Sequence, residues 1–399
     1  MIGYGPYLTL VDEETFKENS RFLALPYRVI HKIVKSNHDP NLICVLGQKS
    51  FNIVKLNEDK QFSDAYGGLI ELNDWIFDIH WYQNNDQLYL IIVLAHNQCV
   101  LFNLKTKKIE NVVYCEQKCM LYSAKIIDTK KFGQGSLQNV FIASGTIYNQ
   151  VLLWSPLTGR VHVKLDGHDG VIFNISFQNN LLFSVSDDRS INVWKLDINE
   201  NSNEVQIASS ELYTRFYGHD ARVWQCACFI NEETSTQYAC SIGEDLNCCL
   251  WNLETKSLVY RFKAMRKGSK NIWSLCVNEK KCEVITGWPD GGLRKFELRN
   301  YMNGVGDLCL LDNQVEWSLS DQIEKDYIRD VLIIKERVIC CTNLGCVYAA
   351  RTAVDFQANK EQMLLLKADS LANYNIMAKV MVNDDPNHWR IAIGTLKGK

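Results

Sequence analysis

Two matched stretches of this chain constrain its fold more than any other feature. Each opens with a Gly-His pair and closes with a Trp: the first runs from Gly167 to Trp194 and the second from Gly218 to Trp251. In both, a Ser lies ten residues and an Asp six residues before the closing Trp. This spacing is typical of a four-stranded β-propeller blade, a repeat that usually holds partners and does not catalyse.

The same period extends along the chain. Residues that end the last strand of each predicted hairpin recur 40 to 57 residues apart, at Val11, Val54, Phe102, Trp154, Trp194, Trp251, Phe296 and Tyr348. A blade typically takes ~40–45 residues, and the flanking runs are rich in β-branched and aromatic residues. We therefore expect an all-β WD-repeat propeller of about seven four-stranded blades over residues 1–300, with its first blade incomplete. Residues 301–399 would begin a second propeller, and both chain ends are expected to be truncated.

Composition limits the classes of partner. A net charge of -3 argues against a chain that grips nucleic acid unaided, because backbone binding needs a concentrated basic face. The longest apolar run, residues 90–95, is too short to cross a bilayer.

Fifteen cysteines, an odd number, indicate a reducing compartment, so we expect a cytoplasmic protein. Cys115 and Cys119 have a ligand-like spacing, but no second pair completes a zinc site, so no metal is expected.

The matched stretches also contain the residue types of a hydrolase triad. The alternative is structural: in such a blade the His bonds the Asp and the Ser, and the Ser accepts the indole N–H of the Trp. Two copies in consecutive blades favour architecture, since an enzyme needs one site. The sequence therefore predicts no catalytic residue and two structural tetrads, formed by His168, Ser184, Asp188 and Trp194 and by His219, Ser241, Asp245 and Trp251.

A further regularity concerns the start of each predicted innermost strand. The third position there is aromatic in six consecutive blades, at His31, Phe77, Tyr122, Phe173, Trp224 and Trp273. One interpretation is inward packing around a narrow channel. The other is a platform for a partner loop or for unstacked bases. Arg28, Arg189 and Arg222 would lie on adjacent loops and supply positive charge.

Several segments carry a family resemblance that a generic propeller does not require. They include DWIFD, CEQKCMLYSA, SGTIYNQVLLW, GHDARVWQC and NIWSLCVNEKKCEVITGWPDGG, in that order. The chain resembles the WD-repeat regulatory subunits of the tRNA wobble-position ribose 2′-O-methyltransferase, although the Trp-Pro pair at 288–289 departs from the usual small residue.

This resemblance implies a protein that is not an enzyme and binds no small-molecule substrate or membrane. Its partners would be an FtsJ-like methyltransferase and, within the complex, the anticodon region of tRNA. S-adenosylmethionine would belong to the partner alone, so no cofactor is expected here. Two alternatives remain: a general WD-repeat scaffold in ubiquitin ligation or endosomal trafficking, and a propeller enzyme that uses His168 or His219.

Overall fold

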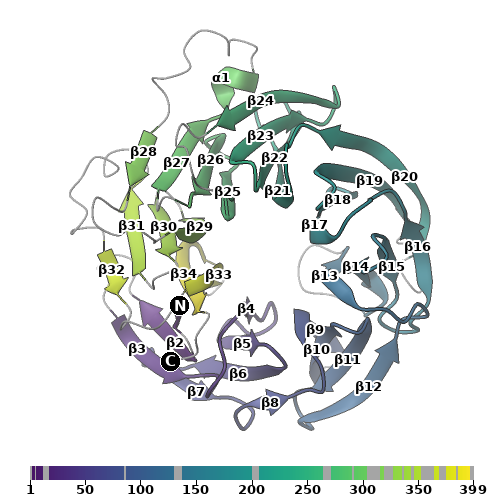
Figure 1. The fold of residues 1–399 in the computed structure, drawn as a ribbon. Coiled ribbons are helices and arrows are strands. Elements are labelled where there is room, and N and C mark those ends of the chain that lie inside the picture. Colours follow the sequence, from purple (N-terminus) through teal and green to yellow (C-terminus); the bar gives the residue numbers. More distant parts are fainter. Residues whose placement is uncertain are drawn as a thin grey trace. The chain divides into compact units, whose positions relative to one another are not determined.

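The computed structural model describes residues 2–4, 6–11, 18–84, 87–129, 137–199, 206–263, 271–289, 292–302, 315–318, 327–334, 337–342, 346–351, 364–367, 374–382 and 385–395. The regular secondary structure of these residues is almost entirely β-strand. The exceptions are one helix, α1 (Arg299–Met302), and one 3₁₀ turn (Leu137–Asn139). The chain divides into two compact units. One unit comprises residues 1–33, 57–62 and 218–399, and the other comprises residues 34–56 and 63–217. Figure 1 labels the strands of both.

The unit of residues 34–56 and 63–217 consists of antiparallel sheets whose strands follow one another in sequence. Its strands are β5 (Leu42–Gly47), β6 (Ser50–Leu56) and β8 (Ile70–Glu71); β9 (Ile76–Asn84), β10 (Gln87–Leu94), β11 (Gln98–Asn103) and β12 (Lys108–Tyr114); β13 (Leu121–Asp128), β14 (Val140–Thr146), β15 (Val151–Trp154) and β16 (Val161–Leu165); and β17 (Ile172–Gln178), β18 (Leu181–Ser186), β19 (Ser190–Asn199) and β20 (Gln206–Tyr217). Each complete set of four is a propeller blade.

The other unit follows the same pattern. Its strands are β1 (Ile2–Tyr4), β2 (Tyr7–Val11) and β3 (Glu18–Leu23); β21 (Val223–Ile230), β22 (Gln237–Gly243), β23 (Asn247–Asn252) and β24 (Ser257–Lys263); β25 (Ser274–Asn278), β26 (Glu283–Gly287), β27 (Gly292–Glu297) and β28 (Val315–Ser318); β29 (Ile328–Ile334), β30 (Arg337–Thr342), β31 (Cys346–Arg351) and β32 (Leu364–Lys367); and β33 (Tyr374–Val382) and β34 (Asp385–Thr395). Two further strands, β4 (Lys32–Lys35) and β7 (Phe62–Asp64), contain points where the chain passes between units.

The blades are held by apolar side chains packed between consecutive sheets. One cluster joins the β9–β12 and β13–β16 sheets and contains Ile91, Leu121 and Trp154, all buried. Because the middle strands of a blade are covered on both faces, they read as largely apolar runs, as in β10, which is buried from Tyr89 to Leu94. The prediction of an all-β propeller with four-stranded blades is confirmed. The division of the chain near residue 300 stays a prediction.

Gly159 fixes the approach of two neighbouring blades. Its backbone has φ +76°, and its carbonyl accepts the N–H of Glu116 at 2.9 Å. A Cβ at this position would overlap the carbonyl of Tyr114, which ends the preceding blade. Glycine is therefore required here for two reasons, the left-handed backbone and the close contact.

Replacing Gly159 with Ala should lower the free energy of unfolding by about 2–4 kcal/mol, from backbone strain and overpacking together. Gly68 provides a matched control, because it has φ +93° and nothing near its missing Cβ. Gly68→Ala should cost only about 1–2 kcal/mol, from the backbone alone. Urea denaturation measures both, and equal losses would contradict the proposed contact with Tyr114.

Candidate functional site

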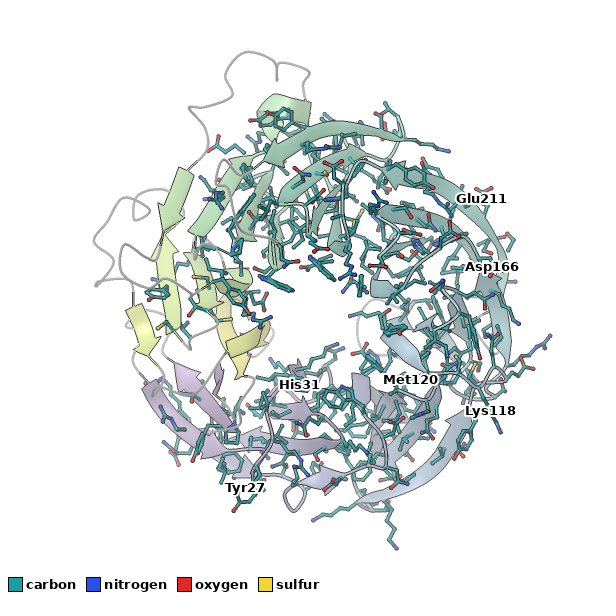
Figure 2. All side chains as sticks on the ribbon, in the orientation of Figure 1. Tyr27, His31, Lys118, Met120, Asp166 and Glu211 are labelled. Atoms are coloured by element: carbon teal, nitrogen blue, oxygen red, sulfur yellow. The ribbon has the colours of Figure 1, made fainter. Side chains whose placement is uncertain are left out.

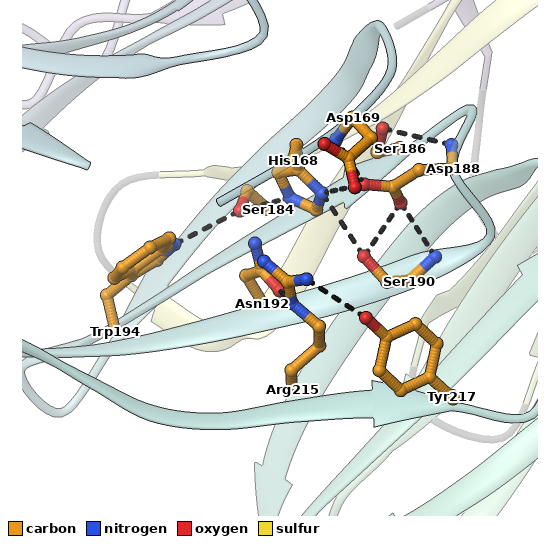
Figure 3. Close-up of polar contacts among 10 residues, drawn as sticks. All are labelled: His168, Asp169, Ser184, Ser186, Asp188, Ser190, Asn192, Trp194, Arg215 and Tyr217. Carbon is orange, nitrogen blue, oxygen red and sulfur yellow. Dashed lines mark hydrogen bonds and ion pairs between the residues drawn. The ribbon is translucent and has the colours of Figure 1, made fainter. Parts of the chain in front are cut away.

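The first predicted tetrad forms within the β17–β20 blade (Figure 3). His168 lies before β17, and its Nδ1 is 2.8 Å from the carboxylate of Asp188 in the β18–β19 turn. Its Nε2 is 2.9 Å from Ser184 Oγ on β18, and that oxygen accepts the indole N–H of Trp194 on β19 at 3.2 Å. The Asp188 carboxylate also accepts the backbone N–H of Asp169 and the Ser190 hydroxyl. All four predicted residues meet in one network.

The second tetrad has the same geometry in the β21–β24 blade. His219 Nδ1 is 3.0 Å from the Asp245 carboxylate, and its Nε2 is 2.8 Å from Ser241 Oγ. Trp251 donates its indole N–H to that same oxygen at 2.8 Å. The two histidines thus sit in equivalent surroundings in consecutive blades, one in each compact unit.

Each network uses its polar groups in a fixed direction. Trp can only donate and a carboxylate can only accept, so a continuous relay runs from indole to Ser, from Ser to His and from His to Asp. Ser184 and Ser241 are completely buried, and the histidines are only 6–7% exposed. A nucleophilic Ser must reach its substrate, whereas these hydroxyls are enclosed and already accept an indole N–H. The arrangement braces adjacent strands and is poorly suited to hydrolysis.

The hydrogen bonds of the two tetrads also lower the pKa values of their aspartates. Burial raises the pKa of Asp188, but the hydrogen bonds from His168 and Ser190 outweigh it, so the pKa lies below its ordinary value. The pKa of Asp245 is lowered in the same way by His219 and Asn247, against the opposing effect of burial. In both cases hydrogen bonding to the charged form dominates.

The pairing of hydroxyl and indole also occurs where no Gly-His pair is present. In the β13–β16 blade, Trp154 donates to Ser144 Oγ at 2.9 Å, and Ser144 donates to Asn97 Oδ1 at 2.9 Å. Asn97, in the β10–β11 turn of the preceding blade, takes the place of the His. Sequence reasoning missed this network, although Ser144 lies ten residues before Trp154, the same spacing as in both tetrads.

The β25–β28 blade forms the hydroxyl–indole pair in another way, and this accounts for Trp288, which stands where a small residue is usual. Phe296 closes the β25–β28 blade and has no indole, yet Thr286 occupies the position ten residues before it. The indole N–H of Trp288 donates to Thr286 Oγ1 at 2.6 Å. The guanidinium of Arg294 lies 4.0 Å from the centre of the Trp288 ring. A Trp from another position therefore satisfies the same buried hydroxyl.

The predicted aromatic positions coincide with a repeated backbone irregularity. At four of these positions the strand carries one residue more than its neighbour, so that residue has no partner in the pairing and the register shifts. The four are Phe77, Tyr122, Phe173 and Trp224. A β-bulge of this kind re-aims one side chain and often lies next to a functional site. Trp273 immediately precedes β25, and its N–H donates to Gly287 O. The next bulge, in β29, holds Arg329, which sequence reasoning missed although it is the third residue of YIRDV.

Three aromatic rings lie next to one another in the unit that contains β21–β32, and two of them stack. The Trp224 and Trp273 rings are 5.8 Å apart and 19° from parallel, and Tyr327 lies 6.1 Å from Trp273. Trp224 donates its indole N–H to Asn271 Oδ1 at 2.9 Å, and the Arg329 guanidinium lies over both Trp273 and Tyr327. We call Trp224, Trp273, Tyr327 and Arg329 the aromatic ladder. All four are half-buried, so the ladder is partly accessible.

The remaining predicted contact residues lie in several environments. Phe77 packs against the buried cluster between the β9–β12 and β13–β16 sheets, which favours the inward-packing interpretation for this residue. Tyr122 is 50% exposed, and Phe173 is half-buried. His31 is half-buried before β4 (Figure 2), and burial lowers its pKa.

The three predicted arginines also differ in exposure. Arg28 is half-buried, whereas Arg189 and Arg222 are exposed. Arg222 lies 3.8 Å from the Glu244 carboxylate, so its charge is partly balanced. Their contact roles stay predictions.

The described residues contain no group of three or more His, Cys, Asp or Glu side chains able to hold a metal ion. Burial raises the pKa of the Cys115 thiol to about 11 and that of Cys99 to about 12, so neither is a ready thiolate ligand or nucleophile. None of the described helices is long and apolar enough to span a membrane.

Residues 159–195 match the sequence family described as WD domain, G-beta repeat. Over 283 residues the chain is 30% identical to the Homo sapiens protein named "tRNA (34-2'-O)-methyltransferase regulator WDR6", covering 67% of this chain and 23% of that protein. The Drosophila melanogaster protein of the same name is 21% identical over 374 residues, covering 88% and 34%. The match thus covers only about a quarter to a third of the length of these relatives.

A solved structure of the computationally designed Ika8 protein superposes with a TM-score of 0.59 at 14% identity, covering 92% of this chain and 96% of that one, which supports the fold alone. Together with the repeat match, the comparisons confirm the resemblance seen in the sequence: this is a WD-repeat chain homologous, over two-thirds of its length, to curated regulators of that name.

The lowered pKa of Asp188 gives the tetrad a pH dependence. A carboxylate whose folded-state pKa is below its ordinary value of 3.8 stabilises the fold above that value, and this stability is lost as the pH falls through the folded-state pKa. Asp188→Asn should therefore reduce the free energy of unfolding at pH 7 by about 1.5–3 kcal/mol, with a smaller difference from wild type as the pH falls below 4. Urea titrations across this range measure the difference. Asp169 is exposed and joins the network only through its backbone N–H. Asp169→Asn should therefore show little difference at any pH, and equal profiles for both variants would contradict the assignment.

Proposed function

We propose that this WD-repeat protein is the non-catalytic subunit that holds an FtsJ-like tRNA methyltransferase and helps position tRNA for 2′-O-methylation of the wobble ribose. The observation that carries the proposal is the similarity over two-thirds of the chain to proteins named as regulators of a tRNA 2′-O-methyltransferase. S-adenosylmethionine and the catalytic residues would belong to the partner, and the complex would act in the cytoplasm.

The buried networks support a non-catalytic role. Both histidines that could serve an enzyme are enclosed between strands and hydrogen-bonded on both ring nitrogens. Their duplicates lie in consecutive blades, as expected for parts that brace a repeat. The chemistry is therefore assigned to the second protein, and this chain contributes binding.

The physical benefit of a separate binding subunit is positional. A rigid second grip on the RNA raises the effective concentration of the wobble ribose at the active site and restricts its orientation. The aromatic ladder is suited to such a grip, because unstacked bases bind to aromatic faces and a nearby guanidinium favours the anionic backbone. A net charge of -3 supplies little attraction for the RNA backbone, so this grip would act within the complex and not by the chain alone.

Loss of the gene should remove 2′-O-methylation at tRNA position 34 while other ribose methylations persist. Mass-spectrometric nucleoside analysis of purified tRNAs from cells with and without the gene measures this, and re-expression should restore the modification. Wild-type levels at position 34 in the deletion strain would refute the proposal. Recovery of the protein with a ubiquitin ligase or a trafficking coat, and with no methyltransferase, would favour a general scaffold.

Trp224→Ala and Trp273→Ala should each weaken binding of an anticodon stem-loop to the methyltransferase complex by about 1–3 kcal/mol, the usual contribution of one stacked base. Trp224→Phe should retain most of the affinity because it keeps an aromatic face. Tyr27→Ala is the control, since Tyr27 is a 91% exposed aromatic of the same compact unit outside the ladder. Unchanged RNA affinity combined with a lower melting temperature would assign both tryptophans to packing alone.

A further inference from the structure

A second surface differs from the ladder because its large apolar side chains face solvent. Trp75, Met120, Tyr122, Ile147 and Tyr148 are 41%, 52%, 50%, 40% and 56% exposed, and all lie in the unit of residues 34–56 and 63–217. We call these five residues the apolar loop patch. Scattered exposed hydrophobic residues are ordinary, but a contiguous group marks an interaction site.

Backbone hydrogen bonds place the loops that carry these five residues next to one another. The N–H of Ile147 donates to the carbonyl of Met120 at 3.0 Å, which places the β14–β15 turn beside the loop before β13. The carbonyl of Ala95 accepts the N–H of Leu121, between Met120 and Tyr122, and the N–H of Ala95 donates to the carbonyl of Trp75. The loops of two consecutive blades are therefore joined edge to edge. Figure 2 marks Met120 among them.

The local backbone explains why these side chains are not in the core. Tyr122 is the extra residue of the β13 bulge, so it leaves the alternation that buries Leu121 and Ser123. Ile147 and Tyr148 occupy a tight turn in which Asn149 adopts φ +61° and the N–H of Tyr148 donates to Thr146 Oγ1. A turn at this point would ordinarily be polar.

The surroundings of the patch resemble the anatomy of a protein interface. Polar pairs border it: His96 Nδ1 lies 2.9 Å from the Asp74 carboxylate next to Trp75, and Gln117 Nε2 donates to Gln150 Oε1 at 3.4 Å. An apolar centre with a polar rim is the usual arrangement at such interfaces. Two Tyr, one Trp and one Met are residue types enriched there. None of the five is cationic, so the patch lacks the groups that would hold RNA phosphates.

The size of the patch also fits a protein partner. Five large side chains about half exposed present roughly 400–500 Å² of surface. This is within the ~300–600 Å² of the largest apolar patch on a typical monomer, a patch that is often functional. A standard interface buries about 800 Å² on each partner, so the patch would form its centre, with the polar rim completing the rest.

We propose that the apolar loop patch is the surface on which the methyltransferase docks, through an uncharged segment rich in apolar or aromatic side chains. This inference rests on the proposed function, which supplies the partner, and adds the surface that receives it. Met120 and Ile147 lie on two loops that a backbone hydrogen bond joins, so we take them as the centre of the patch. Substitution at the centre should therefore act on this contact without touching the aromatic ladder.

The test uses the full chain and the recombinant FtsJ-like tRNA ribose methyltransferase encoded in the same genome. The double variant Met120→Asp/Ile147→Asp should weaken the affinity for the methyltransferase by about tenfold or more, because charged groups would be buried at the centre of the interface.

Ile109→Asp/Leu212→Asp is the matched control. These residues are 47% and 45% exposed on outer strands of the same unit, and the control adds the same charge. It should bind within about twofold of wild type. Calorimetric titration gives the affinities, and equal melting temperatures establish that both variants fold.

The outcomes separate the two proposals. Tight wild-type binding that both double variants retain would overturn the docking surface and leave the proposed function standing. No binding by wild-type protein would remove the methyltransferase partner and the inference with it. A patch variant that loses affinity for an anticodon stem-loop while keeping the methyltransferase would assign the surface to RNA. A wild-type dimer that the patch variant dissociates, with unchanged methyltransferase affinity, would assign it to a second copy of the chain.

Discussion

The hydrogen bond from a buried indole to a buried hydroxyl is the constraint on which the rest of the architecture depends. Ser184 and Trp194 lie on neighbouring strands, and neither polar group can reach water. An unpaired buried group would cost about 1–3 kcal/mol, so each partner fixes the position of the other. In two blades a His and an Asp extend the bond to the loop that enters the blade. The loops are thereby tied to the core that supports them.

The indole–hydroxyl pair also tolerates several side-chain solutions. Asn97 replaces the His beside Ser144, and Trp288 supplies an indole to Thr286 where Phe296 cannot. What the blade requires is a satisfied hydroxyl at one position of its second strand, and more than one residue can provide the partner. This explains how blades with little sequence in common can share one geometry.

The sequence was sufficient for features that depend on local spacing and insufficient for those that depend on neighbouring blades. The offsets of Ser184, Asp188 and Trp194 follow from one hairpin, and hydrogen bonds join the three residues in one network. Asn97 belongs to the preceding blade, so nothing near Ser144 indicated its partner. The contacts of Tyr327 and Arg329 with the Trp273 ring likewise require two blades to be placed side by side. The hydrophobicity of Ile147 alone does not predict that it is exposed. Its outward orientation comes from a tight turn that Thr146 and Asn149 shape.

The repeated bulge shows how an invariant backbone can support different surfaces. Phe77, Tyr122 and Trp224 occupy equivalent positions, yet Phe77 packs into a core cluster, Tyr122 faces solvent and Trp224 stacks on another tryptophan. The bulge places a side chain at the start of the inner strand, and the adjacent loop decides whether that side chain is covered. Loop residues outside these hydrogen-bond networks can change without disturbing the indole–hydroxyl pairs, because those pairs lie deeper in the blade. A propeller of this kind can therefore separate the residues that keep it folded from the residues that bind, which is the property a non-catalytic partner of an enzyme requires.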